Sequence, residues 1–179
     1  VLTDAADVVI YTDDDVEGAT TSGTGGGSAV DARRNRIVNG AMQISQQNIA
    51  ANVDATTGTN WTLDQWAAFL STTPGGTLRV AQVASLTPGG SPFRLRATVQ
   101  VADASIAAGD FYAIAQPVEG ANVPDLRWGT ASARQVLIRY KVRSSQSVTF
   151  GLSITNSAKN RSYVTLVTIA PGEINTDLL

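Results

Sequence analysis

The sequence predicts an all-β protein, an antiparallel sandwich or barrel preceded by an extended N-terminal arm. Helix-favouring residues are scarce, with three Glu and two Lys in 179 residues, whereas Thr, Val and Gly are abundant, which favours strands over helices. Several runs alternate apolar and polar side chains with the period of two that is typical of half-buried strands. Turn-forming sequences rich in Pro and Gly separate these runs.

The chain divides into an acidic arm with a linker, residues 1–32, and a body, residues 33–179. Residues 1–31 hold seven acids and no base, whereas 33–179 hold thirteen bases and eight acids. A short apolar run in the arm precedes sequence rich in Gly, Ser and Thr, which is typical of a linker. Because a lone strand needs a partner edge, we expect this run to form an assembly arm: Val8, Val9, Ile10 and Tyr11.

Alternation predicts about eight strands in the body. The clearest case is 93–101, where Leu95, Ala97 and Val99 alternate with Arg96 and Thr98. The expected strands are 36–46, 63–71, 77–86, 92–101, 111–118, 134–144, 147–155 and 162–169. The last of them is apolar on much of both faces, so we expect it in the centre of a sheet. Residues 103–108 suggest a helical turn, and 119–133 a long irregular connection.

The same tetrapeptide, Thr-Pro-Gly-Gly, stands at 73–76 and again at 87–90. Proline presets φ near −65° and glycine accepts positive φ, so each tetrapeptide predicts a type II turn. One strand-length segment lies between them, which predicts a meander.

The composition excludes several classes of site. The chain has no His and no Cys, which excludes zinc fingers, Ser-His-Asp triads, Cys nucleophiles and disulfides. The glycines at 23–27 precede no Gly-Lys-Ser/Thr, which disfavours a phosphate loop. Asp13, Asp15 and Gly18 fit part of an EF-hand loop, but Thr24 stands where its bidentate Glu belongs. We therefore expect no cofactor and no metal.

Carboxylate pairs can support glycoside hydrolysis without His. The candidates are Asp64, Asp110, Glu119, Asp125 and Glu173. Their spacing does not place two of them across one cleft, and several occupy ordinary turn positions. We expect no catalytic residue and no enzyme activity.

Aromatic side chains can stack on sugar rings while neighbouring polar groups bind hydroxyls. Trp66 lies in an apolar run and is expected in the core. The glycan-contact candidates are Trp61 with Asn60, and Trp128 with Asp125 and Arg127; the alternative for each Trp is that it plugs an end of the core.

Basic residues follow the polar side of two expected strands: Arg94, Arg96, Arg139, Lys141 and Arg143. This row suits an anionic glycan, nucleic acid or an acidic protein patch, and equally a solvated sheet face. The net charge of −2 and the absence of the aromatic-basic signature of an RNA-binding sheet favour a chain with no nucleic-acid partner. No apolar run approaches the ~18 residues of a membrane span and no signal peptide opens the sequence, so we expect no membrane insertion.

Four segments resemble a known family. Asn35–Asn48 (NRIVNGAMQISQQN) looks like the first strand of a β-sandwich domain of bacteriophage tail-fibre and related virion appendage proteins. Thr62–Trp66 (TLDQW) is similar to the family's Asp-x-Trp strand. Tyr112–Gly120 resembles its strand ending in Gln-x-apolar-Glu-Gly, also seen in jelly-roll carbohydrate-binding modules, and Asn156–Tyr163 is similar to the start of a late strand.

The resemblance spans about 35–170 and implies a jelly-roll-like β-sandwich in a phage virion protein, usually a homotrimer. It implies a tail fibre or a head or neck fibre that contacts other virion proteins, with host-surface polysaccharide as a further partner. Relatives continue past the position of Ile174, so we expect the sandwich of 33–179 to be incomplete at its C-terminal end. The alternative function is a carbohydrate-binding module of a secreted bacterial enzyme.

Overall fold

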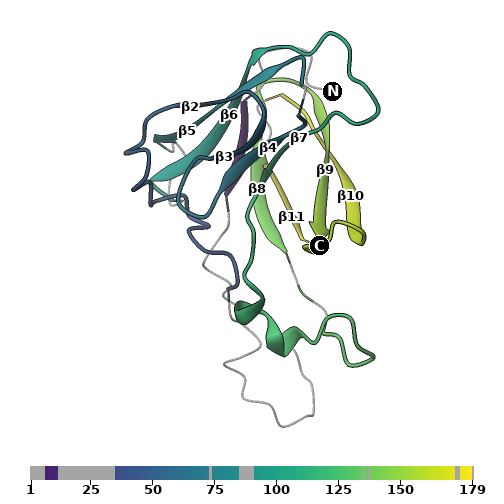
Figure 1. Ribbon diagram of the computed structural model, residues 1–179. Coiled ribbons are helices and arrows are strands. Elements are labelled where there is room, and N and C mark those ends of the chain that lie inside the picture. Colours follow the sequence, from purple (N-terminus) through teal and green to yellow (C-terminus); the bar gives the residue numbers. More distant parts are fainter. Residues whose placement is uncertain are drawn as a thin grey trace.

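The computed structural model describes residues 7–11, 35–72, 74–84, 91–134, 136, 138–171 and 174–178 (Figure 1). Strands dominate the described chain and their ladders are antiparallel, so the predicted all-β fold is confirmed. The only helical pieces among these residues are two short 3-10 turns, η2 (Gly120–Asn122) and η3 (Pro124–Leu126).

One layer is a six-stranded sheet in the order β11-β8-β1-β6-β5-β2. Its strands are β1 (Asp7–Tyr11), β2 (Val53–Ala55), β5 (Thr77–Ala84), β6 (Phe93–Val101), β8 (Arg139–Arg143) and β11 (Ile174–Leu178). The hairpin of β5 and β6 forms its longest ladder, from Thr77 opposite Val101 to Ala84 opposite Phe93.

Two smaller sheets cover this layer. The first has the order β3-β4-β7, with β3 (Gly58–Trp61), β4 (Ala67–Leu70) and β7 (Tyr112–Ala115). The second is the hairpin of β9 (Val148–Thr155) and β10 (Ser162–Ile169). The arrangement is a β-sandwich whose second layer is divided; the jelly-roll order that the resemblance implies is not confirmed.

The divided layer gives two cores. One lies over β5 and β6, where Leu78, Val80 and Leu95 pack with Leu70 and Trp66. The other lies over β8, where Tyr140 and Val142 pack with Val148, Val167 and Ile169. Burial of apolar side chains at alternate strand positions is the main force that holds the two layers together.

Strand β1 joins the two halves of the large sheet. It pairs with β6 on one side and with β8 on the other. The register places Leu95, Ile10 and Val142 in one row, so Ile10 stands between a residue of the first core and a residue of the second. The apolar run of the arm therefore forms a strand, as predicted. Its two neighbours, β6 and β8, belong to the same chain. The boundary expected between residues 32 and 33 does not separate this strand from the large sheet.

The strand expected at 36–46 is absent. This segment forms turns, because Asn39 and Met42 adopt positive φ of 52° and 57°, which interrupts extended backbone. The expected strand 63–71 shortens to β4, while the short strands β2 and β3 and the C-terminal β11 were not predicted. Residues 103–108 form no helical turn, whereas 119–133 is the irregular connection expected.

The first Thr-Pro-Gly-Gly segment owes its glycines to close packing. Neither Gly75 nor Gly76 has positive φ, so the predicted type II turn is wrong. A Cβ on Gly75 would lie 2.5 Å from Asp103 Oδ1, and one on Gly76 would lie 2.7 Å from the backbone oxygen of Val101. The second copy of this sequence, at 87–90, lies outside the described residues.

Strand β10 is not central. It pairs only with β9 among the described strands and stands at the right of Figure 1. Its inner face is buried at Val167 and Ile169, but Val164 and Leu166 on the outer face are 59% and 74% exposed. The apolar residues on both faces thus predicted a central position that the strand does not occupy.

Candidate functional site

Asn39 organises the loop at the start of the described body. Its Oδ1 accepts the N–H of Ile44 (3.0 Å), and its Nδ2 donates to the backbone oxygens of Ile44 (2.8 Å) and Asp64 (3.0 Å). The backbone oxygen of Asn39 accepts the indole Nε1–H of Trp66 at 3.2 Å. One residue therefore connects two segments that carry the family resemblance, 35–48 and 62–66.

The Asp-x-Trp segment, residues 62–66, is a tight turn that also donates and accepts hydrogen bonds of its own, including bonds with the loop that contains Asn39. Asp64 Oδ2 accepts the N–H of Gln46 at 2.6 Å. The N–H of Thr62 donates to the oxygen of Trp66 at 2.9 Å, and the N–H of Trp66 to the oxygen of Leu63 at 2.9 Å. Trp66 is 6% exposed, so its predicted place in the core is confirmed.

Gln116 brings in a third resembling segment, 112–120. Its Oε1 accepts the N–H of Val38 at 2.8 Å, and its Nε2 donates to the oxygen of Val38 at 2.6 Å. The side-chain amide thus satisfies both backbone groups of Val38, as a paired strand would.

Arg36 fixes the adjoining 3-10 turns. Its guanidinium donates to the backbone oxygen of Asn122 and to Oδ2 of Asp125, which closes an ion pair. The hydrogen bond from Arg36 lowers the pKa of the Asp125 carboxyl, and burial opposes this effect. We call the cluster of Arg36, Asn39, Asp64, Trp66 and Gln116 the polar joint.

A shallow hollow lies beside the polar joint. Its volume is about 110 Å³, well below the ~300–1,000 Å³ of typical small-molecule sites. The residues that line it are Arg36, Val38, Gln65, Gln116, Pro117, Val118, Glu119 and Asn122. Arg36 and Gln116 already use their polar groups to hold backbone, so the joint is built to fix loops rather than to enclose a ligand.

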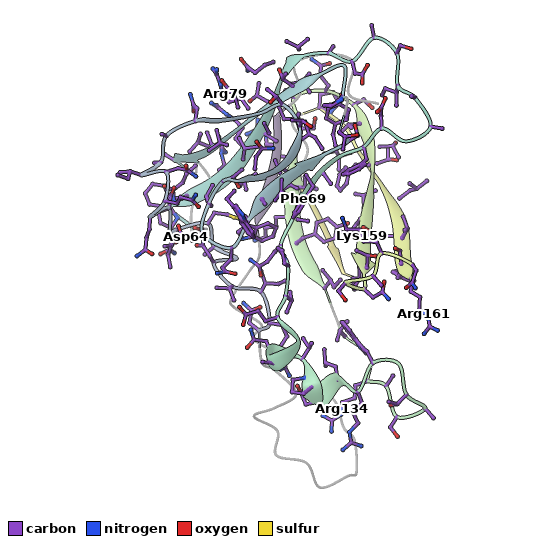
Figure 2. The ribbon with its side chains drawn as sticks, viewed as in Figure 1. Asp64, Phe69, Arg79, Arg134, Lys159 and Arg161 are labelled. Atoms are coloured by element: carbon purple, nitrogen blue, oxygen red, sulfur yellow. The ribbon has the colours of Figure 1, made fainter. Side chains whose placement is uncertain are left out.

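The two predicted glycan contacts lie apart. Trp61, at the end of β3, is 46% exposed, and the Nδ2 of neighbouring Asn60 donates to the oxygen of Thr57 at 2.9 Å. Figure 2 shows Asp64, which is close to Trp61 in sequence, beside the sheets in the upper part of the view. Arg134 lies in the lower part, near the two 3-10 turns. Arg134 accepts the Nε1–H of Trp128 through its backbone oxygen at 3.1 Å, so the two Trp do not form one platform.

The polar neighbours of Trp128 have structural roles. Trp128 is 47% exposed, but its indole N–H is used within its own loop. Asp125 is paired with Arg36, and Arg127 ends η3 with a left-handed φ of 51°. Trp128 is therefore half-exposed with its indole N–H already bonded, and the Asp125 carboxylate is already paired.

The described carboxylate candidates are also engaged or dispersed. Asp110 accepts Ser71 Oγ–H at 3.0 Å and the N–H of Ala107 at 2.8 Å, as a turn residue does. Glu119 lines the shallow hollow, and Glu173 lies outside the described residues, as do Asp13, Asp14 and Asp15. Within the described part of the chain, no three carboxylates gather as a metal site would require.

The expected basic row does share one face of the large sheet. Val9 of β1 stands opposite both Arg96 and Arg143, which places the alternating basic positions of β6 and β8 on the same side. The Nε atoms of Arg94 and Arg96 are buried and have no hydrogen-bond partner. This face is cationic, but no anion partner is identified by its geometry.

No sequence pattern predicted the Arg36–Asp125 ion pair, or the hydrogen bonds by which Gln116 holds the backbone of Val38. The ion pair joins residues 89 positions apart, a separation that leaves no local pattern.

The described residues contain no helix that is long and apolar enough to cross a membrane. Comparisons with protein-family profiles, curated proteins and solved structures gave no match.

Proposed function

We propose that this chain is a structural component of a phage virion appendage, a tail fibre or a head or neck fibre. The observation that carries the proposal is the polar joint. Three of the four segments that resemble virion appendage domains, 35–48, 62–66 and 112–120, meet there through named hydrogen bonds. The segments that resemble a family of spacer and attachment domains thus support the fold of this chain.

The fourth resembling segment, 156–163, also stabilises backbone. Asn156 Oδ1 accepts the N–H groups of Asn160 and Arg161 at 3.2 Å each, which closes the turn between β9 and β10. All four segments therefore stabilise the backbone of the β-sandwich, which supports a structural role for the chain.

Within this proposal, the partners are other virion proteins and further copies of the chain, and the location is the phage particle. A homotrimer and a contact with host-surface polysaccharide belong to the proposal through the family resemblance. Attachment through the N-terminal residues would use 1–6 or the acidic stretch after Tyr11, because β1 itself completes the large sheet.

The test is the location of the chain in a phage lysate. Purified particles, banded in a density gradient, are digested and searched by mass spectrometry for peptides of residues 35–171. We expect these peptides to band with the major virion proteins, and a stop codon at Gln46 to remove them. Peptides found only in the particle-free supernatant would reject the proposal and favour the secreted module.

The carbohydrate-binding module is the second candidate, and the half-exposed rings of Trp61 and Trp128 favour it. Glycan binding predicts that Trp61→Ala or Trp128→Ala loses binding to extracted surface polysaccharide while the protein stays folded. Phe111, 49% exposed, supplies a matched control: Phe111→Ala should bind normally. Equal binding by all three variants would remove both Trp sites.

A further inference from the structure

The outer face of β10, beside the edge that pairs with no described strand, carries apolar side chains that the described chain leaves uncovered. Val164 and Leu166 of this face are 59% and 74% exposed; Tyr163, on the opposite face near the start of the strand, is 65% exposed. Gly151 of β9 stands opposite Leu166, so no side chain of β9 covers Leu166 from across the ladder. Exposed apolar residues beside an unpaired strand edge mark an interaction surface.

This edge lacks the usual protection against strand pairing. Natural edges carry charges, Pro or bulges, but Val148–Thr155 and Ser162–Ile169 contain no charged residue and no Pro. Their ladder runs without a register shift from Ser162 opposite Thr155 to Ile169 opposite Val148. The strand therefore presents a regular, neutral edge.

The register shows which backbone groups face outward. The N–H of Asn156 donates to the oxygen of Arg161 at 3.1 Å, so these two form a hydrogen-bonded pair. Hydrogen-bonded and non-hydrogen-bonded pairs alternate along an antiparallel ladder. It follows that the backbone N–H and C=O groups that point away from β9 belong to Ser162, Val164, Leu166 and Thr168.

A second copy of β10 matches this edge. In an antiparallel pair centred on Thr165, Val164 stands opposite Leu166 of the other copy, and Ser162 opposite its Thr168. All four residues have outward backbone groups, so these positions form hydrogen-bonded pairs, and apolar residues meet apolar ones while hydroxyls meet hydroxyls.

Charge favours the antiparallel direction. The turn before β10 carries Lys159 and Arg161 (Figure 2). Antiparallel pairing places these cations at opposite ends of the joined strands, whereas parallel pairing would bring like charges together, which is destabilising. The strand itself adds no repulsion, because it is neutral.

We propose that β10 pairs with β10 of a second copy about a twofold axis at Thr165, which joins two hairpins into one four-stranded sheet. The contact does not depend on the virion assignment. It is isologous, so a chain held by no other contact forms a dimer through it.

The first experiment compares the sedimentation mass of the full 179-residue chain with that of Leu166→Lys over a concentration series. The substitution places an ammonium group opposite Val164 of the other copy at two symmetric positions, and a Lys on a strand edge opposes pairing; the exposed position leaves the fold intact. We expect the mass to fall by about half, as an isologous contact requires. The control is Val101→Lys, on a β6 residue that is 52% exposed, which should keep the wild-type mass. Equal masses for wild type and Leu166→Lys would overturn the proposal.

The second experiment tests the register. Thr165→Cys introduces a thiol into a chain that has no Cys, and the twofold axis brings the two thiols to a non-hydrogen-bonded pair with Cα atoms ~4.5 Å apart, within disulfide range. Mild oxidation should give a disulfide-linked pair of chains. Ser153→Cys, on the outer face of β9, should stay unlinked. No linkage at Thr165→Cys, or equal linkage at both, would overturn the proposed register.

Discussion

Gln116 hydrogen-bonds through its side-chain amide to both backbone polar groups of Val38, 78 residues earlier in the chain. A strand neighbour would satisfy the same two groups, but Val38 lies in a turn and not in a strand. The side chain thus replaces a missing ladder and anchors the turns of 35–50 to the end of β7. The irregular start of the body is fixed by side chains rather than by sheet pairing.

Gln116→Leu should lower the free energy of unfolding by about 1–2 kcal/mol, because two hydrogen bonds of about 1 kcal/mol net each are lost. Urea denaturation measures the change. Gln100→Leu, at an exposed position of β6, is the control and should stay within about 0.5 kcal/mol of wild type. Equal losses in the two variants would show that the amide of Gln116 has no special role.

Gly76→Ala should destabilise the fold by about 1–3 kcal/mol, the usual cost of overpacking. The new Cβ would lie 2.7 Å from the oxygen of Val101 and 3.1 Å from the Oη of Tyr112, so backbone must move. Gly109→Ala is the matched control, since nothing lies within 4 Å of its Cβ position; there we expect no loss, or a gain of about 0.4–1 kcal/mol. Thermal melts of the two variants decide the matter.

Asp103 should contribute to acid sensitivity. Its carboxylate accepts Tyr112 Oη–H at 2.8 Å and the N–H of Ser105 at 3.1 Å. The bond from Tyr112 is the largest cause that lowers the pKa of Asp103, followed by the bond from Ser105, while burial opposes them. Because the folded pKa lies below the unfolded value of about 3.9, the stabilisation is present above that pH and is lost as pH falls through the folded pKa.

The measurement is the free energy of unfolding as a function of pH for wild type, Asp103→Asn and Tyr112→Phe. Each variant should be less stable than wild type near neutral pH and should lose less stability between pH ~4 and ~2. Asp54 and Asp125, whose pKa values are lowered by Arg79 and Arg36, also contribute to the acid dependence. Parallel curves for all three proteins would contradict the role of Asp103.

Removing β1 should weaken the whole sandwich. Deletion of residues 1–11 exposes the facing edges of β6 and β8 and breaks the row of Leu95, Ile10 and Val142 that bridges the two cores. We expect a lower melting temperature and concentration-dependent aggregation, since open edges invite pairing. Deletion of 1–6, which removes no residue of β1, is the control. An unchanged melting temperature after the longer deletion would mean that the body folds without the arm.

Alternation along the sequence determined much of the fold. It placed β5, β6, β9 and β10 close to their observed bounds. An alternation with period two is a local property of a pleated strand that packs one face on the core and turns the other to water. It also placed Trp66 in the core, from the apolar residues beside it. The segments with family resemblance contain all five residues of the polar joint, although their mutual contacts were not visible in the sequence.

Tertiary structure alone decided the rest, because long-range pairing joins residues that no local pattern relates. It inserted β1 between β6 and β8 of its own chain, paired Arg36 with Asp125, and pressed Gly76 against the backbone of Val101. Among the described strands it also left β10 at an edge, although apolar residues lie on both faces of that strand. A strand's own residues determine which faces avoid water, whereas the neighbouring strands that cover those faces are set by the packing of the whole molecule.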